Sequence, residues 1–540
     1  MLRVRWLGRV RYRDAHALQR GLFTTSTDDH LLLLEHPHVY TLGVRADMGN
    51  LLVPPADVGA ELVRADRGGD VTYHGPGQLV GYPILTVPGK RGGGMADTVA
   101  YVRSVEQLLI DTLTDLGVQR AGRLDGYPGV WIEDRKIAAI GVKLSRGRTM
   151  HGFALNVAPD LTYFDHIIPC GITDKSVTSL AAEGIAVDMH AVVDAVTARA
   201  TERWGGDGWE RQDVVWSTPH DRPLRLLGRL EEAGVTDGLS IESRKPAHVK
   251  ARLRITDDYV RLKKTMRDLS LVTVCEEAGC PNIFECWSDG TATFMINGER
   301  CTRACGFCLV DTRHPLPIDD GEPHRVAEAV TRMGLRHVVV TAVARDDLDD
   351  GGAAAFAATI AAIRGRTPSV RVEVLIPDCK GHPESLRTIF DAAPDVLNHN
   401  IETVARLQRA VRPNASYARS LAVLARAKAA GLTTKSGLIL GLGEREDEVV
   451  ATLADLSAVG TDIVTIGQYL RPTAQHLPVA RWWSPDEFAR LKVAGEALGI
   501  GHIESSALTR SSYHAGEAAN VAISRRFPLA QKGETRSVAK

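Results

Sequence analysis

The sequence predicts an α/β protein with two folded regions, a mixed α/β domain followed by a partial barrel of six strand–helix units. Three observations support this. The chain has 540 residues, enough for two or more domains with their own cores. Residues 1–217 mix strand and helix patterns. From residue 293 onward, short apolar runs alternate regularly with helical segments, which favours parallel strands and right-handed crossovers.

The first region begins with an alternating strand pattern at Leu2, Val4 and Trp6. Further strands are predicted at 31–35, 39–44, 129–133, 136–144 and 149–157. A helix is predicted over 100–117, because Val102, Val105, Leu109, Leu113 and Leu116 recur at helical spacing. Residues 218–243 are rich in charge, Gly and Pro, which predicts a linker with a short amphipathic helix near 224–233.

The second region shows six strand patterns, at 293–297, 338–343, 371–376, 396–401, 435–440 and 463–469. Helical segments follow at 322–333, 420–430, 444–459 and 485–498. In such folds the carboxyl ends of the strands carry the functional residues. Polar strings are predicted to meet at that rim: Arg345–Asp347, Asn398–Glu402, Lys435–Ser436, Gly441–Glu444 and Gln468–Arg471.

Composition excludes several classes of function. The formal net charge is −1, so no overall field favours nucleic acid or an anionic membrane as a partner. No apolar run approaches the roughly 18 residues of a membrane helix, and the Arg-rich N-terminus lacks the apolar core of a secretory signal. One cysteine precedes residue 270 and seven follow it. This asymmetry indicates ligand use in a reducing compartment, and we expect a cytoplasmic protein.

Six of the eight cysteines lie between residues 275 and 308. Cys275, Cys280 and Cys286 form one set of three, and Cys301, Cys305 and Cys308 form another. A closed structural zinc site takes four ligands. Three thiolates would bind a 4Fe–4S cluster and leave one iron open to another ligand. Spacing alone also permits a zinc site built from four of the six thiols.

The second set, with Phe307 before its last cysteine, resembles the radical S-adenosylmethionine (SAM) enzymes. Residues 244–540 as a whole resemble lipoyl synthase. The matching strings are Cys275–Trp287, Thr293–Ile296, Cys301–Cys308, Asn398–Thr403, Gly467–Pro472 and Arg510–His514. Ala344 departs from the family pattern, which has an acidic or polar residue there.

This resemblance implies two 4Fe–4S clusters and SAM as cofactors. Cys301, Cys305 and Cys308 would bind the cluster whose open iron takes SAM. Cys275, Cys280 and Cys286, with Ser512, would bind an auxiliary cluster that gives up its sulfur. The implied reaction inserts two sulfur atoms, at carbons six and eight of an octanoyl chain, and needs an electron donor such as ferredoxin or flavodoxin. A zinc-stabilised binding barrel is the non-enzymatic alternative.

Three features of the first region have possible catalytic roles. The glycines of Arg67–Gln78 allow backbone N–H groups to approach a ligand, and Arg67 and His74 add hydrogen-bond donors. A plain glycine-rich turn between strands explains the same residues equally well. Cys170 is a potential nucleophile, although a lone intracellular cysteine is more often an inert core residue. Lys136 lies among apolar residues, where an ammonium needs a partner unless it reaches water.

These strings resemble those of lipoyl(octanoyl) transferases, which share the fold of lipoate and biotin protein ligases. The resemblance implies that Cys170 carries the acyl group as a thioester with Lys136 as its partner, acting either as a cation or as a neutral base. The implied substrate pocket consists of Arg67, Gly68, Gly69, Asp70, Val71, Thr72, Tyr73, His74, Ala139, Ile140, Gly141, Gly152, Phe153 and Ala154.

Together the resemblances imply a bifunctional enzyme with an octanoyltransferase domain at 1–217, a linker at 218–243 and a lipoyl synthase domain at 244–540. The implied partners are octanoyl-acyl carrier protein, the lipoyl domains of 2-oxoacid dehydrogenase complexes and the glycine cleavage H protein. Two alternatives remain for the first region: an ATP-dependent lipoate ligase, which has no need of Cys170, or a non-catalytic module that binds lipoyl domains.

Overall fold

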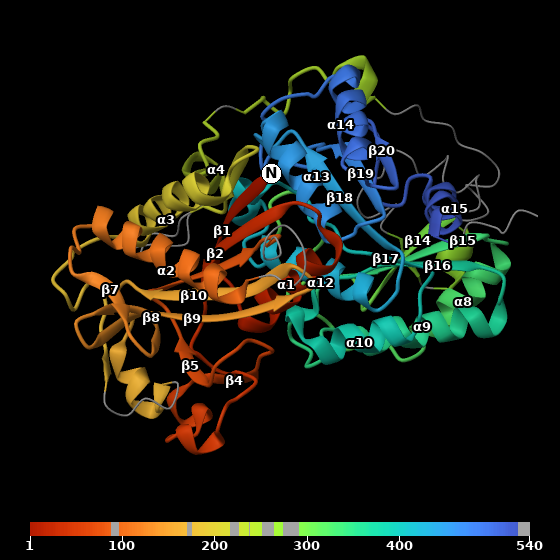
Figure 1. Ribbon diagram of the computed structural model, residues 1–540. Coiled ribbons are helices and arrows are strands. Elements are labelled where there is room, and N and C mark those ends of the chain that lie inside the picture. The colour runs from red at the N-terminus through yellow and green to blue at the C-terminus, as the bar shows by residue number, and fades with distance from the viewer. Residues whose placement is uncertain are drawn as a thin grey trace, which may run out of the picture. The chain divides into compact units, whose positions relative to one another are not determined.

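The computed structural model describes residues 1–87, 97–169, 175–215, 226–236, 238–250, 264–269, 271–273 and 291–526. The chain forms two compact units (Figure 1). The first is built on Met1–Thr236, Thr403–Arg426 and Asp447–Gly460, and the second on Asp237–Glu402, Ala427–Glu446 and Thr461–Lys540. The predicted linker helix is present as α4 (Leu226–Glu232), while the predicted domain boundaries stay predictions.

The first unit contains a large mixed sheet, as predicted. Its strands follow the order β12-β1-β2-β6-β10-β9-β8-β7, and β11 pairs with β9. The parallel pairs are β1 with β2, β1 with β12, and β9 with β11; the other pairs are antiparallel. The bounds are β1 Leu2–Arg9, β2 Asp29–Glu35, β6 Gln78–Ile84, β7 Ala121–Leu124, β8 Tyr127–Ile132, β9 Arg135–Ser145, β10 Arg148–Asn156, β11 Ser176–Val177 and β12 Trp209–Asp213.

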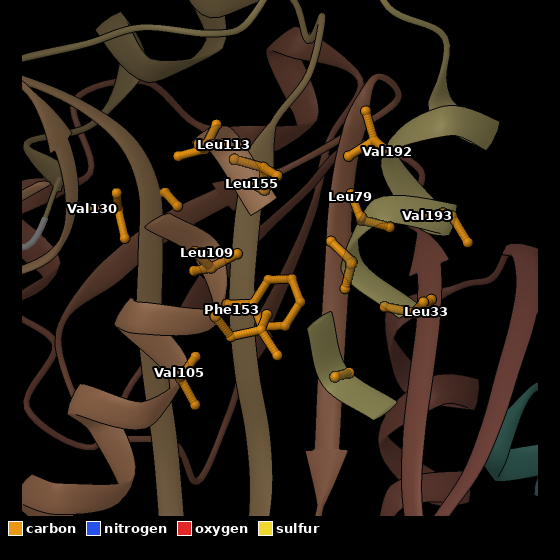
Figure 2. Close-up of a cluster of buried hydrophobic side chains, with 14 of the residues drawn as sticks. Leu33, Leu79, Val105, Leu109, Leu113, Val130, Phe153, Leu155, Val192 and Val193 are labelled. Carbon is orange, nitrogen blue, oxygen red and sulfur yellow. The ribbon is translucent and has the colours of Figure 1, made fainter. Parts of the chain in front are cut away.

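Two helices, α2 (Thr98–Asp115) and α3 (Met189–Trp204), pack on this sheet and form its main hydrophobic core. Figure 2 shows Val105, Leu109 and Leu113 of α2 and Val192 and Val193 of α3 packed with strand residues such as Leu79, Phe153 and Leu155. The helical spacing in the sequence predicted these α2 contacts. The helix begins where the Asp97 side chain accepts hydrogen bonds from the backbone N–H groups of Val99 and Ala100.

A smaller sheet positions the glycine-rich string. It has the order β4-β3-β5, with bounds β3 Val39–Leu42, β4 Glu61–Arg64 and β5 Val71–His74. Helix α1 (Tyr12–Thr25) contacts β6 and β10 of the large sheet and contributes nothing to the main core. Tyr12 instead packs with Val39, Val63 and Ala65 of the smaller sheet and its connections.

The second unit contains a sheet of seven parallel strands, β14 to β20, with β13 antiparallel at one edge. The six predicted strands are present in the predicted order, and the sequence reading missed the short strands β13 and β20. The bounds are β13 Val272–Thr273, β14 Thr291–Ile296, β15 His337–Ala342, β16 Arg371–Leu375, β17 Val396–Asn398, β18 Thr434–Leu440, β19 Ile463–Gln468 and β20 His502–Ser505.

Helices alternate with these strands along the chain, as a partial barrel of strand–helix units requires. They are α8 Glu322–Arg332, α9 Ala353–Arg366, α10 Pro383–Asp391, α11 Gln408–Val411, α12 Tyr417–Ala429, α13 Glu446–Ala458, α14 Pro485–Ala497 and α15 Ala515–Arg526. Helix α15 packs Ala518 and Ala519 against Val396 and Ile463, the first residues of β17 and β19. It therefore covers the amino ends of these strands and leaves their carboxyl ends to the polar residues.

None of the helices in the described ranges has both the length and the apolar character needed to cross a bilayer.

Replacing Leu109 by Ala should destabilise the first unit by about 3 kcal/mol, because Leu109 is fully buried in the main core and the change leaves a cavity. Val99→Ala is the matched control on the same helix, since Val99 is 65% exposed. Urea-dependent proteolysis of the full chain, read at peptides from 97–156, measures the effect. Equal urea midpoints for the two variants would contradict this assignment of the core.

Candidate active sites

The three strings of the predicted acyl pocket meet in the first unit. In the β9–β10 pair, Gly141 lies opposite Gly152 and Ala139 opposite Ala154. The glycine-rich string reaches the same place, because the Gly68 N–H donates to the Val142 carbonyl at 3.0 Å. A Cβ on Gly141 would lie 3.1 Å from Arg67 Cδ, so glycine allows the Arg67 side chain to pass over β9.

The side chains of the 67–74 string have different surroundings. Arg67 is 6% exposed and donates to the Thr41 carbonyl at 2.6 Å. Val71 and Tyr73 lie in a hydrophobic cluster with Tyr40 and Phe164, because alternate strand residues point to the same face. The predicted role of these two residues in the substrate pocket stays a prediction. Asp70 accepts from the Asn50 side chain and tethers the loop.

His74 and Phe153 are both buried, His74 with a hydrogen-bond partner and Phe153 in the main core. His74 Nδ1 lies 2.8 Å from Gln78 Oε1. Burial, together with the neighbouring His36, lowers the pKa of His74 well below its ordinary value, so the ring is neutral at neutral pH. Phe153 belongs to the main core (Figure 2), and its ring fills the space that a Gly81 side chain would occupy. His74 is therefore neutral and Phe153 is apolar, so neither side chain presents a charge to a ligand.

Asp66, which the sequence reading missed, joins three elements beside the pocket. Its Oδ1 lies 3.0 Å from His16 Nε2 and 2.8 Å from His151 Nε2, and its Oδ2 accepts from Lys143 Nζ at 2.7 Å. The hydrogen bonds from His151 and His16 hold the pKa of Asp66 well below its usual range. The carboxylate thus fixes α1, β9 and β10 around the neighbouring Arg67. Its position directly before the glycine-rich string was the available signal.

His151 has a left-handed backbone (φ 58°) within β10, an unfavourable conformation for a residue with a side chain. Its N–H donates to Gln19 Oε1 of α1 at 2.9 Å, and its ring is held by Asp66. The next residue, Gly152, lies so close to β6 that a Cβ would come 2.2 Å from the Gly81 carbonyl oxygen. The bend at His151 therefore sets the course of the pocket strand 152–154.

Lys136 lies on β9, three residues before the pocket strand 139–141 begins. It is 7% exposed, and its carbonyl accepts from the Thr178 N–H at 2.9 Å. Val177 pairs with Lys136, so the chain that follows Cys170 is anchored beside this lysine. Cys170 itself lies outside the described residues, and its predicted role stays a prediction.

In the second unit, the loop carrying Cys301, Cys305 and Cys308 follows β14 at the carboxyl ends of the strands. Cys301 Sγ accepts from the backbone N–H groups of Arg303 (3.4 Å) and Ala344 (3.3 Å). The Ala344 carbonyl accepts from both the N–H and the hydroxyl of Thr302. These contacts use only the main chain of Ala344, so they do not depend on the side chain at this position.

Arg303 fixes this loop to the next two strands. It donates to both carboxylate oxygens of Asp346 at 2.7 and 2.8 Å and to Asp378 at 2.6 Å. Although burial opposes its charge, these two carboxylates hold the pKa of Arg303 above its ordinary value. On the other side, Leu477 N–H donates to the Gly306 carbonyl at 2.9 Å, and His476 Nε2 lies 2.9 Å from the Cys308 carbonyl.

Three thiols on one loop suit a cluster better than a closed zinc site, which takes four ligands. The N–H donors to Cys301 Sγ stabilise a thiolate, and a cube bound by three thiolates keeps one iron open to another ligand. The predicted auxiliary ligands Cys275, Cys280 and Cys286 lie outside the described residues.

The C-terminal string Arg510–His514 reaches the same rim. Asn400, which follows β17, donates to Ser511 Oγ at 2.7 Å. A Cβ on Gly467 of β19 would lie 2.1 Å from the Thr509 carbonyl oxygen, so glycine permits this approach. The half-buried Ser512 is therefore carried on a segment fixed to two strand ends, and its role as a ligand stays a prediction.

In three of the polar strings predicted for the rim, side chains make hydrogen bonds within the protein. Gln468 is buried and donates to the Leu440 and Arg481 carbonyls. In the turn Gly441–Glu444, the Gly441 and Leu442 N–H groups donate to Glu444 Oε2. Lys435 is fully buried near the start of β18 and donates to Glu373 Oε1 at 2.9 Å. The prediction that Lys435 belongs to the rim was wrong.

Family models match both regions. Residues 11–201 match the lipoyl protein ligase A/B catalytic domain, 212–280 the N-terminal domain of lipoyl synthase of the radical SAM family, and 295–456 the radical SAM superfamily. Lipoyl synthase of Rubrobacter xylanophilus is 54% identical over 311 residues, 57% of this chain and 94% of its own length. That of Mycobacterium tuberculosis is 53% identical over 292 residues, 54% of this chain and 93% of its own.

Among solved structures, a bi-partite lipoate protein ligase from Thermoplasma acidophilum is similar over 40% of this chain and 87% of its own length. The sequence identity is 16% and the TM-score is 0.32. The fold, the cysteine loop and the family models define a fusion of a lipoyl protein ligase A/B catalytic domain with a radical SAM enzyme. Through its C-terminal part, the chain belongs to the lipoyl synthase family. The zinc-stabilised binding barrel is thereby set aside.

Replacing Asp66 by Asn should lower the urea midpoint of the first unit at pH 7, because the neutral amide loses the charge that His151, His16 and Lys143 surround. The folded-state pKa of Asp66 is depressed, so its contribution is present above the unfolded pKa of about 3.9. That contribution is lost as the pH falls below this value. The difference between variant and wild type should therefore shrink on acidification.

The matched control is Asp125→Asn, the same chemical change at an exposed turn residue. It should leave the urea midpoint within experimental scatter at pH 7. A midpoint difference for Asp66→Asn that grows on acidification would contradict the assignment.

Proposed function

We propose that the chain performs two consecutive reactions of protein lipoylation. The first unit moves an octanoyl group from octanoyl-acyl carrier protein, through Cys170, to a lysine of a lipoyl domain. The lipoyl synthase part then inserts two sulfur atoms at carbons six and eight. One observation supports the first half of the proposal. The strings 67–69 and 152–154 meet 139–141 at β9, and β9 also carries the buried Lys136.

The acyl transfer proceeds as two displacements. The Cys170 thiolate attacks the octanoyl carbonyl, a new thioester forms, and the carrier leaves as a thiolate that takes a proton from solvent. The neutral amine of the target lysine then attacks the Cys170 thioester, an amide forms, the Cys170 thiolate is released, and the amine gives up one proton to solvent. An ordinary cysteine, with a pKa of about 8.5, is only a few per cent thiolate at neutral pH, so a lysine partner is needed. We propose that Arg67, whose side chain passes over β9 at Gly141, helps to bind the acyl carbonyl.

The second reaction requires cofactors that the cysteines are suited to hold. Cys301, Cys305 and Cys308 would hold a 4Fe–4S cluster with SAM on its open iron, and Cys275, Cys280, Cys286 and Ser512 would hold the auxiliary cluster. When bound and reduced, the first cluster with SAM supplies a carbon radical that removes hydrogen from an unactivated C–H bond. The protein's part is to hold the Cys301 loop through Ala344, Arg303 and Leu477.

The proposed protein substrates are lipoyl domains of 2-oxoacid dehydrogenase complexes and the glycine cleavage H protein, with ferredoxin or flavodoxin as the electron donor. The family model of the first unit covers both ligases and transferases, so ATP dependence separates the two functions. A ligase activates its acid as an acyl-adenylate and has no need of a cysteine.

Replacing Cys170 by Ser should reduce octanoyl transfer from acyl carrier protein to a lipoyl domain on the order of 10³-fold or more, since the nucleophile is lost. Transfer by the wild type should be independent of ATP, and mass spectrometry should detect an octanoyl thioester on Cys170. The control is Cys379→Ser, which removes a buried thiol of the other unit and should leave transfer unchanged. ATP-dependent transfer that survives Cys170→Ser would establish the ligase function instead.

The anaerobically purified chain should contain about eight iron and eight acid-labile sulfide atoms, because two cubes each hold four of both. Changing Cys275, Cys280 and Cys286 together to Ala should leave about four of each. Changing Cys301, Cys305 and Cys308 together should do the same. Zinc without sulfide, or four irons in the wild type, would contradict the proposal of two clusters.

A further inference from the structure

The turn that follows β16 has a strained backbone. Cys379 has φ 44° and Lys380 has φ 53°, so two consecutive residues with side chains adopt a left-handed conformation before Gly381. This conformation is unfavourable for a residue with a Cβ, because the Cβ comes too close to the following carbonyl oxygen. Such strain persists where the surrounding structure holds it, and it is common at functional sites. The contacts of the turn explain why the strain is kept.

The turn closes on Asp378. The Asp378 carbonyl accepts from the Gly381 N–H at 2.6 Å, and the Asp378 side-chain Oδ1 accepts from the Lys380 N–H at 3.0 Å. Cys379 is 2% exposed, and a Cβ on Gly351, which precedes α9, would lie 3.1 Å from Cys379 Cα. The left-handed residues therefore turn the chain back toward Asp378 and fix the direction of its carboxylate.

The same carboxylate oxygen binds the cysteine loop. Asp378 Oδ1 accepts from Arg303 Nη2 at 2.6 Å, and Arg303 lies between Cys301 and Cys305 in the chain. Asp378 is 1% exposed and Arg303 is 8% exposed, so water and salt screen this ion pair little. The strained turn and the cysteine loop are thus joined at one buried atom.

Asp346 also binds Arg303, but its surroundings differ. The Asp346 side chain is 27% exposed, and the Asp346 N–H donates to the Thr302 hydroxyl at 3.0 Å. Asp346 and the cysteine loop therefore hold each other in place. Asp378 follows a different strand, β16, so its contact with Arg303 fixes the loop to a further part of the sheet.

Arg303 connects this anchor to a predicted cluster ligand, because its N–H donates to Cys301 Sγ at 3.4 Å. We propose that Asp378 is a positioning residue, held by the strained turn, that keeps the cysteine loop in its cluster-binding conformation. The inference rests on the proposed cluster at Cys301, Cys305 and Cys308. It gives a role to residues 378–380, which the proposed function does not use.

The test measures how fast the anaerobic, reduced full chain releases iron to the ferrous chelator ferrozine. Changing Cys275, Cys280 and Cys286 to Ala leaves the cluster of the Cys301 loop as the source of iron. In this background Asp378→Ala should release iron about tenfold faster, because groups that orient metal ligands contribute roughly 10–100-fold to metal binding. Asp378→Asn keeps an oxygen acceptor without the charge and should show a smaller increase. The matched control is Asp391→Ala, an exposed residue of α10 that should change nothing.

Two changes of Lys380 in the same background test the turn itself. Lys380→Gly keeps the N–H group and favours the left-handed backbone, so iron release should match that of the parent. Lys380→Pro removes the N–H donor to Asp378 and fixes φ near −65°, so iron release should be as fast as in Asp378→Ala.

The opposite background, with Cys301, Cys305 and Cys308 changed to Ala, separates positioning from general destabilisation. Asp378→Ala should leave iron release from this background unchanged. Equal acceleration in both backgrounds, or unchanged release from the Cys301 loop in Asp378→Ala, would overturn the inference and leave the proposed function standing. A wild-type chain that binds no iron and no sulfide would instead overturn the proposed function.

Discussion

The arrangement of the first site depends on the pairing of β9 with β10. This ladder places Gly141 beside Gly152 and Ala139 beside Ala154, and the two glycines permit the close approach of Arg67 and of β6. The Gly68 N–H then bonds to the Val142 carbonyl, which brings the glycine-rich string onto β9. A shift of this register by one residue would turn the opposite face of β9 toward the glycine-rich string.

Asp66 makes this arrangement resistant to change. Its two carboxylate oxygens receive contacts from α1, β9 and β10, so three elements are joined at the residue before Arg67. The bend at His151 costs energy on its own, because a left-handed backbone is unfavourable for a residue with a Cβ. The bonds of His151 to Gln19 and Asp66 offset that cost. The backbone strain at His151 is thus offset by the hydrogen bonds of its N–H group and its ring.

Periodicity in the sequence predicted the elements of both units well, since apolar residues at strand or helix spacing must face a core. The α2 residues Val105, Leu109 and Leu113 and the six strands β14 to β19 follow this rule. The strings 139–141 and 152–154 were located only through the resemblance to lipoyl(octanoyl) transferases, whereas the glycines of 67–78 were visible in the sequence itself. Lys435 was misplaced, because a polar residue in a strand can equally satisfy a buried partner such as Glu373. The contacts of Asp66 with His16, His151 and Lys143 were not predictable, since they join residues far apart in the sequence.

The two proposed sites must handle thiolates in different ways. A cluster-binding thiolate such as that of Cys301 has to stay deprotonated, and fixed main-chain N–H groups from Arg303 and Ala344 suit a permanent anion. The proposed Cys170 nucleophile has to become thiolate, thioester and thiolate again in every cycle. A fixed array of donors would stabilise the anion and lower its nucleophilicity. In the proposed mechanism, the single partner Lys136 provides a smaller stabilisation than such an array. That is enough to raise the thiolate fraction at neutral pH while leaving the sulfur reactive.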